Sequence, residues 1–154
     1  PYADFVKSGH LIATDGDAVD YEVVQLEIEA LAKRYRVKWL CADKWNSTMM
    51  TQALAKKGIK TVEIEQTMGG MSPAMKEIER LLRTGELTHD KNPLARWCFG
   101  NVIVATDGNM NIKPMKNKSI EKIDPIVALI DAMAAAMKLE KKVCAYEEHG
   151  IRMA

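Results

Sequence analysis

Residues 122–133, KIDPIVALIDAM, place an aspartate directly before a proline at the start of an apolar run. Asp followed by Pro at the first helical position is a favoured helix start. The run therefore predicts a long last helix from Asp124 or Pro125 to about Leu139, and only Asp131 breaks its apolar character. A capping carboxylate uses one oxygen on a backbone N–H, so Asp124 is a candidate both for the helix cap and for a cation ligand.

Upstream of this helix, strand-like and helix-like segments alternate, which is typical of a sheet with helices on its faces. We predict strands over residues 9–16, 37–43 and 59–66 and a hairpin over 101–116 that turns at Asp107–Gly108 or just after it. Helices are predicted to start at Asp20, at Asn46 or Ser47, at Ser72–Pro73 and near Pro93. The sequence thus indicates one α/β domain.

Three local patterns refine this prediction. The first helix places Val24, Ile28, Leu31 and Tyr35 on one face, which we expect to point inward. Glycine ends two helices, at Gly58 and Gly85, and the segment TMGGM (67–71) is expected to be a connector. Five methionines at helical positions are expected to pack in the core: Met49, Met50, Met75, Met133 and Met137.

Composition excludes several classes of protein. Twenty-two Lys and Arg residues balance 21 acids, so net charge gives no global attraction to nucleic acid. Cys41, Cys98 and Cys144 show no CxxC spacing, which argues against a zinc site or a disulfide framework and fits a reducing cytosol. The longest apolar run is shorter than a membrane span, and the start has no signal-peptide pattern, so a soluble cytoplasmic chain is expected.

Two acids stand where loops converge in an α/β sheet. Asp43 follows the strand predicted over 37–43, and Asp124 precedes the last helix. By position alone Asp43 is a turn residue and Asp124 a cap, and both remain open as metal ligands. Paired carboxylates suit Mg²⁺ or Mn²⁺, and two such ions about 3.5–4 Å apart hydrolyse phosphodiesters.

Four lysines lead up to Asp124. They are Lys113, Lys116, Lys118 and Lys122, with Glu121 as the one acid among them. A lysine run of this kind either binds DNA phosphates or forms a solvated loop, and the sequence leaves both readings open.

The segments CADKWN (41–46), VEIEQTMGGMSPAMKEIERLL (62–82) and NIKPMKNKSIEKIDPIVALIDAM (111–133) together resemble the C-terminal nuclease part of tailed-phage terminase large subunits. The resemblance covers most of residues 1 to about 137. It implies an RNase H-like mixed sheet flanked by helices, two Mg²⁺ or Mn²⁺ ions, and cutting of concatemeric viral DNA during packaging. By position, Asp43 and Asp124 match the family's catalytic, metal-binding acids, and Trp45, Asn46 and Gln66 match residues that support the site.

We expect one departure from the family. The resemblance implies that the chain begins downstream of the strand that carries the family's first metal-binding aspartate. Asp4, Asp15 and Asp17 lie in the wrong context to replace it. We therefore expect a fragment of a terminase large subunit or a product truncated in a prophage, with a nuclease domain over residues 1–154, a tail over 140–154 and no N-terminal strand or strands. With two acids of the family's three, we expect weak metal affinity and a weakly active or inactive isolated chain. An exposed sheet edge would then invite self-association.

The resemblance also implies partners, namely double-stranded DNA and, in a full-length protein, the terminase small subunit and portal protein. The expected location is the host cytoplasm. Two alternatives remain open. One is a non-catalytic DNA-binding or packaging-motor assembly module with the same fold, and the weaker one is another RNase H-like enzyme such as a resolvase or transposase.

Overall fold

The computed structural model describes residues 1–42 and 48–140. Helices and strands alternate along the chain in the order α1 (Tyr2–Lys7), α2 (Tyr21–Arg34), β1 (Leu40–Ala42), α3 (Thr48–Lys56), β2 (Thr61–Glu63), α4 (Met68–Thr84), α5 (Pro93–Gly100), β3 (Val104–Thr106), β4 (Ile112–Pro114) and α6 (Asp124–Glu140). The mixed α/β class predicted from the sequence is confirmed. None of the helices in the described part of the chain has the length and hydrophobicity of a membrane span.

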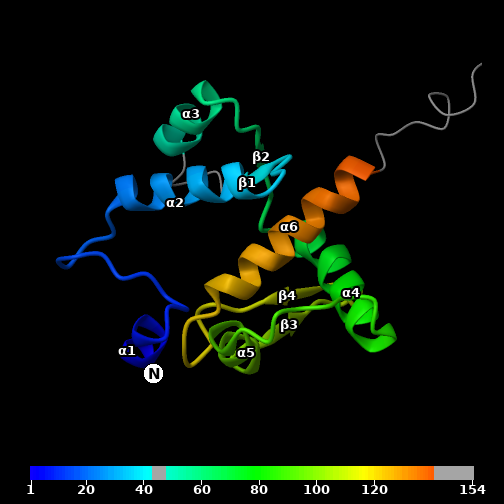
Figure 1. The fold of residues 1–154 in the computed structure, drawn as a ribbon. Helices are drawn as coiled ribbons and strands as arrows, with labels where there is room; N and C mark the ends of the chain where they lie inside the picture. The colour runs from blue at the N-terminus through cyan, green and yellow to red at the C-terminus, as the bar shows by residue number, and fades with distance from the viewer. Residues whose placement is uncertain (43–47, 141–154) are drawn as a thin grey trace, which may run out of the picture.

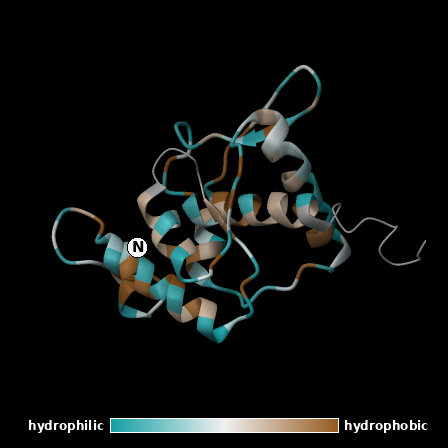
Figure 2. Ribbon diagram, turned by 90° about the horizontal axis from the view of Figure 1, so that it is seen from above, coloured by the Kyte–Doolittle hydropathy of each residue, from teal (hydrophilic) through white to brown (hydrophobic). Residues whose placement is uncertain are grey.

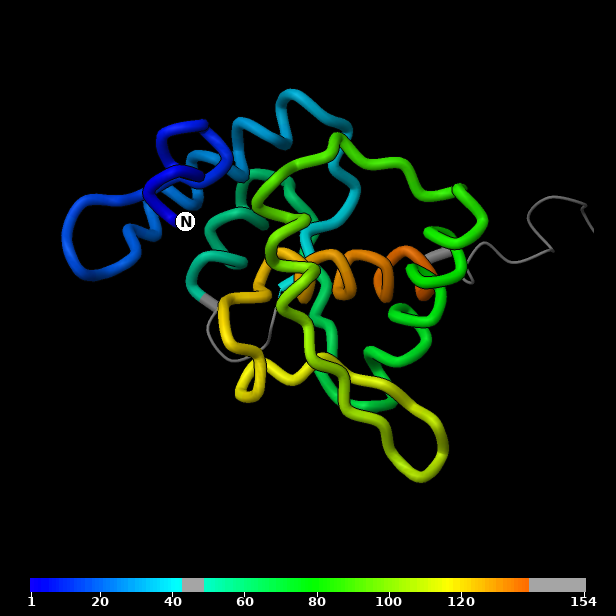
Figure 3. The backbone as a smooth tube through the Cα atoms, turned by 90° about the horizontal axis from the view of Figure 1, so that it is seen from below, coloured from blue at the N-terminus to red at the C-terminus, as the bar shows by residue number. Residues whose placement is uncertain are grey.

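The described strands form two small sheets on different sides of α6. β1 and β2 are parallel, with Leu40 opposite Thr61 and Ala42 opposite Glu63. β3 and β4 are antiparallel, and Asp107 closes the turn between them by accepting the backbone N–H groups of Asn109 and Asn111. Figure 1 shows α6 between the two sheets, and Figure 3 shows the hairpin projecting away from the helices. The predicted hairpin is therefore confirmed.

The core forms where α4 crosses α6. Ile123, Ile126, Val127 and Ile130 recur at the spacing of one helical face and are each at most 7% exposed. They pack with a buried stripe of α4, Met71, Ala74 and Ile78, and with Cys98 of α5. Figure 2 shows hydrophobic residues on the helices at the centre and hydrophilic residues along most of the outer loops.

The helix α4 begins five residues earlier than the sequence predicted. Thr67 caps it, since its hydroxyl accepts the Gly70 N–H, so TMGGM is the first turn rather than a connector. Pro73 lies inside the helix, where its missing N–H removes one bond of the ladder. Burial of Met71, which is 1% exposed, favours the longer helix. Gly85 ends α4 in the left-handed region as predicted.

Ser72, which was predicted to cap this helix, has a different role. Its side chain is buried, and its hydroxyl accepts the backbone N–H of Ile112 at 3.1 Å. This bond joins the second turn of α4 to the first residue of β4. The serine therefore holds the hairpin on the core.

The N-terminal part of the chain differs more from the prediction. The predicted strand over 9–16 is wrong, because these residues pair with no neighbouring strand in the described structure. α2 has its predicted cap, with Asp20 accepting the Glu22 N–H at 2.8 Å. On its expected inner face, however, Leu31 and Tyr35 are exposed, since α2 packs mainly against α3.

The methionine prediction holds in part. Met75, Met133 and Met137 pack against the core, and Met50 is partly buried. Met49 is 87% exposed, so its predicted burial is wrong. It lies at the start of α3, where no described element covers it.

The first turn of α4 supplies a test of this packing. A methyl group at Gly70 would lie closer than 3.0 Å to the backbone oxygen of Glu65, whereas one at Gly69 would meet nothing within 4 Å. We expect Gly70→Ala to lower the free energy of unfolding by about 1–3 kcal/mol, because the backbone carbonyl has to move. Gly69→Ala is the matched control and is expected to be neutral or stabilising by up to about 1 kcal/mol. Urea unfolding followed by circular dichroism measures both, and equal effects would contradict the close approach.

Candidate functional site

Asp124 is the first residue of α6 and pairs with a lysine. The backbone oxygen of Ile123 accepts the N–H groups of Ile126 and Val127, so Ile123 occupies the cap position. The prediction that the Asp124 side chain caps the helix is therefore wrong. Its Oδ1 instead lies 3.0 Å from the Nζ of Lys116, and both side chains are more than half exposed.

The four candidate lysines lie on one continuous stretch of chain. Lys113 is in β4, and Lys116, Lys118 and Lys122 follow on the loop that leads to α6. A tight turn, in which the Met115 carbonyl accepts the Lys118 N–H at 3.2 Å, brings this loop back toward the helix. The three loop lysines are exposed and Lys113 is partly buried.

The one acid within the lysine stretch is engaged elsewhere. Glu121 accepts the hydroxyl of Tyr2 at 3.2 Å, which ties the loop to α1. Among the described residues, Lys116 is the only one of the four lysines with an ion pair. Three ammonium groups on this surface are therefore not neutralised by a described carboxylate.

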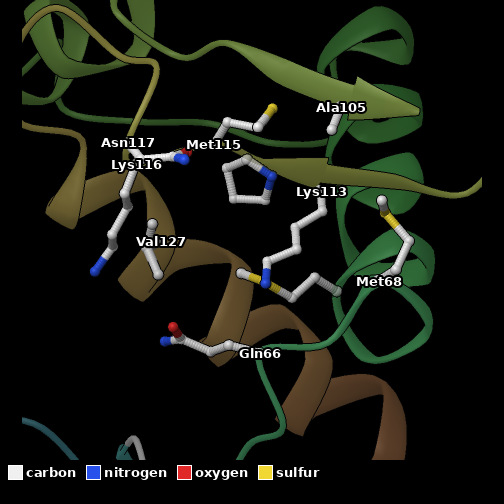
Figure 4. Close-up of a pocket in the computed structure, with 10 residues that line it drawn as sticks. Gln66, Met68, Ala105, Lys113, Met115, Lys116, Asn117 and Val127 are labelled. Atoms are coloured by element: carbon white, nitrogen blue, oxygen red, sulfur yellow. The ribbon is translucent and has the colours of Figure 1, made fainter. Parts of the chain in front are cut away.

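A cavity of about 390 Å³ opens beside these lysines. Its apolar wall comes from the first turn of α4, from β4 and from α6, and consists of Met68, Met71, Pro114, Met115 and Val127. Figure 4 shows Lys113 extending from β4 across this cavity toward Gln66. We call this cavity the thioether pocket.

Asp131 is a buried acid whose role the sequence did not reveal. It is 7% exposed, and its Oδ2 accepts the Nε2 of Gln66 at 3.0 Å. Burial, and next the negative charge of Asp131, raise the pKa of the Cys41 thiol above its ordinary value. This agrees with the packing of α6, which carries Asp131, against β1, in which Cys41 is the middle residue.

A sequence signal for Asp131 does exist. It follows Asp124 by seven residues, which is about two helical turns, so the two acids project from the same side of α6. Asp131 interrupts the apolar run, and this interruption alone does not indicate a functional acid. The seven-residue spacing from Asp124 does. Gln66, predicted as a supporting residue, bonds this second acid and not Asp124.

Asp43, Trp45 and Asn46 lie outside the described residues, so the predicted pairing of Asp43 with Asp124 is not tested here. Within residues 1–42 and 48–140, no three His, Cys, Asp or Glu side chains gather in a way that would hold a metal ion. Asp124 is the predicted metal ligand that the structure does place.

A comparison with protein families matches residues 1–140 to the endonuclease domain of the terminase large subunit. Among curated proteins, the chain is 37% identical over 156 residues to Protein YmfN of Escherichia coli K12, covering 98% of this chain and 34% of that protein. It is 29% identical over 138 residues to the terminase large subunit of Enterobacteria phage HK97, covering 88% of this chain and 27% of that protein.

Solved structures give the same result. The crystal structure of the HK97 bacteriophage large terminase matches with a TM-score of 0.80 and 28% identity, covering 88% of this chain and 29% of that one. The chain thus spans about a third or less of the length of these relatives.

The proximity of Asp131 to β1 has a measurable consequence at Cys41. Asp131→Asn removes a negative charge that disfavours the thiolate, so the pKa of Cys41 is expected to fall. The pH profile of iodoacetamide alkylation, measured with Cys98 and Cys144 replaced by serine, should shift to lower pH. Asp124→Asn in the same background is the control and should leave the profile in place. An unchanged profile in the Asp131 variant would mean that this acid does not face β1.

Proposed function

Because the chain belongs to the family of terminase large subunit endonuclease domains, we propose that it is a metal-dependent DNA endonuclease domain that hydrolyses phosphodiester bonds. The biological reaction would be the cutting of concatemeric viral DNA during genome packaging. The observation that carries this proposal beyond family membership is the position of Asp124, an exposed carboxylate in the first turn of α6 beside a lysine-rich loop.

The donor chemistry at Asp124 fits Mg²⁺ or Mn²⁺. A carboxylate oxygen is the hard ligand that these ions prefer, and the exposed contact between Asp124 and Lys116 at 3.0 Å is one that a metal ion would replace. We propose Asp43 and Asp124 as the catalytic, metal-binding acids. Two bound ions would supply the activation of a water molecule and the stabilisation of the leaving oxygen.

The remaining residues have distinct roles in this proposal. Lys118 and Lys122 bind phosphates of double-stranded DNA, and Lys113 contacts the DNA from the cavity beside them. Lys116 would exchange its contact with Asp124 for a phosphate if a metal ion took its place. Gln66 holds Asp131 in place through its 3.0 Å bond, so it supports the site without touching the reacting atoms. Trp45 and Asn46 are proposed to support Asp43, which they follow closely in the sequence.

The family also suggests a wider context. We propose that β1 and β2 belong to an RNase H-like sheet that is completed by further strands, and that residues 1–154 act as one nuclease domain. In a full-length protein, the terminase small subunit and portal protein would be its partners in the host cytoplasm.

A non-catalytic DNA-binding or motor-assembly module is the alternative. The Lys116–Asp124 pair favours it, because this pair neutralises the acid that the chemistry requires. The two functions make opposite predictions for the acids and the same prediction for the lysines, so mutating the acids separates them.

Asp43→Asn and Asp124→Asn are expected to lower Mn²⁺-dependent nicking of supercoiled plasmid by at least about 100-fold, because each removes a proposed metal ligand. Asp17→Asn, at an exposed acid of the N-terminal segment, is the matched control and should nick normally. Nicking that survives in Asp43→Asn, or no nicking by the unchanged chain, would favour the non-catalytic module.

Metal binding gives a second readout for the same acids. Mn²⁺ titrations followed by electron paramagnetic resonance should show weaker binding in Asp124→Asn. Lys116→Ala should strengthen binding by up to about fivefold, because an exposed ion pair contributes at most about 1 kcal/mol. An affinity that Lys116→Ala leaves unchanged would show that the lysine does not compete for this carboxylate.

The lysines are tested by the salt dependence of DNA binding. Lys116→Ala combined with Lys118→Ala should weaken binding about equally for all sequences and reduce the slope of log affinity against log salt by about 0.9 for each lost phosphate contact. Fluorescence anisotropy measures this slope. Lys138→Ala, at an exposed lysine in the last turn of α6, is the control. If the slope does not change in the double variant, the lysine stretch is only a solvated loop.

A further inference from the structure

The thioether pocket combines an apolar wall with a charged group that no described acid neutralises. Met71 and Val127 at its base are at most 4% exposed, and Met68 and Met115 form its more open sides. Its volume of about 390 Å³ lies within the range of small-ligand sites, which is roughly 300–1,000 Å³. A ligand for this pocket needs an apolar face.

Lys113 determines what else the ligand must carry. Its ammonium group extends across the cavity, and no ion pair of Lys113 exists among the described residues. An ammonium has three donors and no acceptor, so the ligand needs an acceptor near this position. A purely apolar occupant, such as a leucine side chain of a partner, would leave the charge unsatisfied.

Gln66 adds the complementary group. Its Nε2 donates to the carboxylate of Asp131 at 3.0 Å, which leaves the Oε1 as the acceptor of this side chain. Gln66 and Lys113 both line the pocket. The pocket therefore offers a hydrogen-bond donor, Lys113, and an acceptor, Gln66, beside a wall of thioether groups. These groups together suit a flat aromatic ring that has both donors and acceptors on its edge.

We propose that the thioether pocket binds one unpaired nucleobase of the DNA strand that lies beside Asp124. Methionine sulfur contacts aromatic rings favourably, and base edges carry the acceptors that lysine seeks. Lys116 links this pocket to the proposed reaction centre, since it lines the cavity and also pairs with Asp124. The attached phosphate lies near Lys116, whose ammonium group supplies the positive charge at this end of the cavity.

This inference rests on the proposed DNA binding but not on cleavage. It means that the domain prefers DNA whose base pairing is locally broken over a regular duplex. An enzyme that uses an extruded or mismatched base gains selectivity, because the unstacking cost is smallest there.

The test compares two DNA probes in buffer without divalent metal, a matched duplex and the same duplex with one bulged guanine. Fluorescence anisotropy should show at least about threefold tighter binding of the bulged duplex, from two thioether contacts with the base. Met68→Ala combined with Met115→Ala should remove this preference and leave binding of the matched duplex unchanged. Met110→Ala, at a 70% exposed methionine of the hairpin turn, should keep it.

A second measurement uses the unchanged chain, so its result does not depend on whether the methionine variants fold. With ¹³C-labelled methionine methyl groups in the unchanged chain, the signals of Met68 and Met115 should move upfield on addition of the bulged duplex, because a stacked ring shields them. The signals of the exposed Met49 and Met110 should stay in place. Lys113→Met keeps the apolar wall and removes the donor, and it should reduce the preference for the bulge.

The outcomes separate this inference from the nuclease proposal. Equal affinity for both duplexes, or equal methyl shifts with both, would overturn the nucleobase pocket even if the chain cuts DNA. A preference for the bulge in a chain that does not nick plasmid would support the pocket and overturn the nuclease. A chain that binds neither duplex would overturn both.

Discussion

The packing of α6 against α4 is the constraint on which the rest of the structure depends. α6 presents isoleucine and valine at successive turns, and these side chains bury the central stripe of α4. Because an interior of this kind is close-packed, neither helix can shift along the other without opening voids. The packing thereby fixes the positions of the groups on the first turns of the two helices. These groups are Asp124 on α6 and, on α4, Met68 and Met71, which form part of the wall of the thioether pocket.

Polar contacts then attach the strands and loops of the site to this pair of helices. The buried hydroxyl of Ser72 holds the first residue of β4, and so sets where the lysine stretch begins. Gln66 reaches from the segment after β2 to Asp131, and so joins the parallel pair of strands to the middle of α6. Each of these bonds joins residues that are at least 40 positions apart in the sequence, so the site exists only in the folded chain.

The electrostatics of the site follow from the same arrangement. A lysine-rich loop returns onto the helix that carries Asp124, and Lys116 pairs with this acid, whereas the other three lysines have no ion pair with a described residue. An exposed ion pair of this kind is weak, which makes it exchangeable for stronger charge partners. Another charged group can therefore replace Lys116 at this carboxylate without any change in the fold.

The sequence by itself determined the class of fold, the family and most helix and strand positions. Periodic apolar residues in 122–139 specify a helix face, and the Asp20 cap and the Gly85 stop are local backbone chemistry that needs no tertiary partner. Where burial competes with local preference, the sequence was misleading. Pro73 indicated a helix start, yet the burial of Met71 extended α4 to Thr67, and residues 9–16 found no strand to pair with.

Only the tertiary structure decided the partners of the polar side chains. Nothing in the sequence indicates that Asp124 pairs with Lys116, that Ser72 holds β4, or that Asp131 rather than Asp124 receives Gln66. The physical reason is that capping and turn rules predict hydrogen bonds between a side chain and the backbone of neighbouring residues. In the folded chain, each polar group instead bonds to whichever partner the packing brings within about 3 Å.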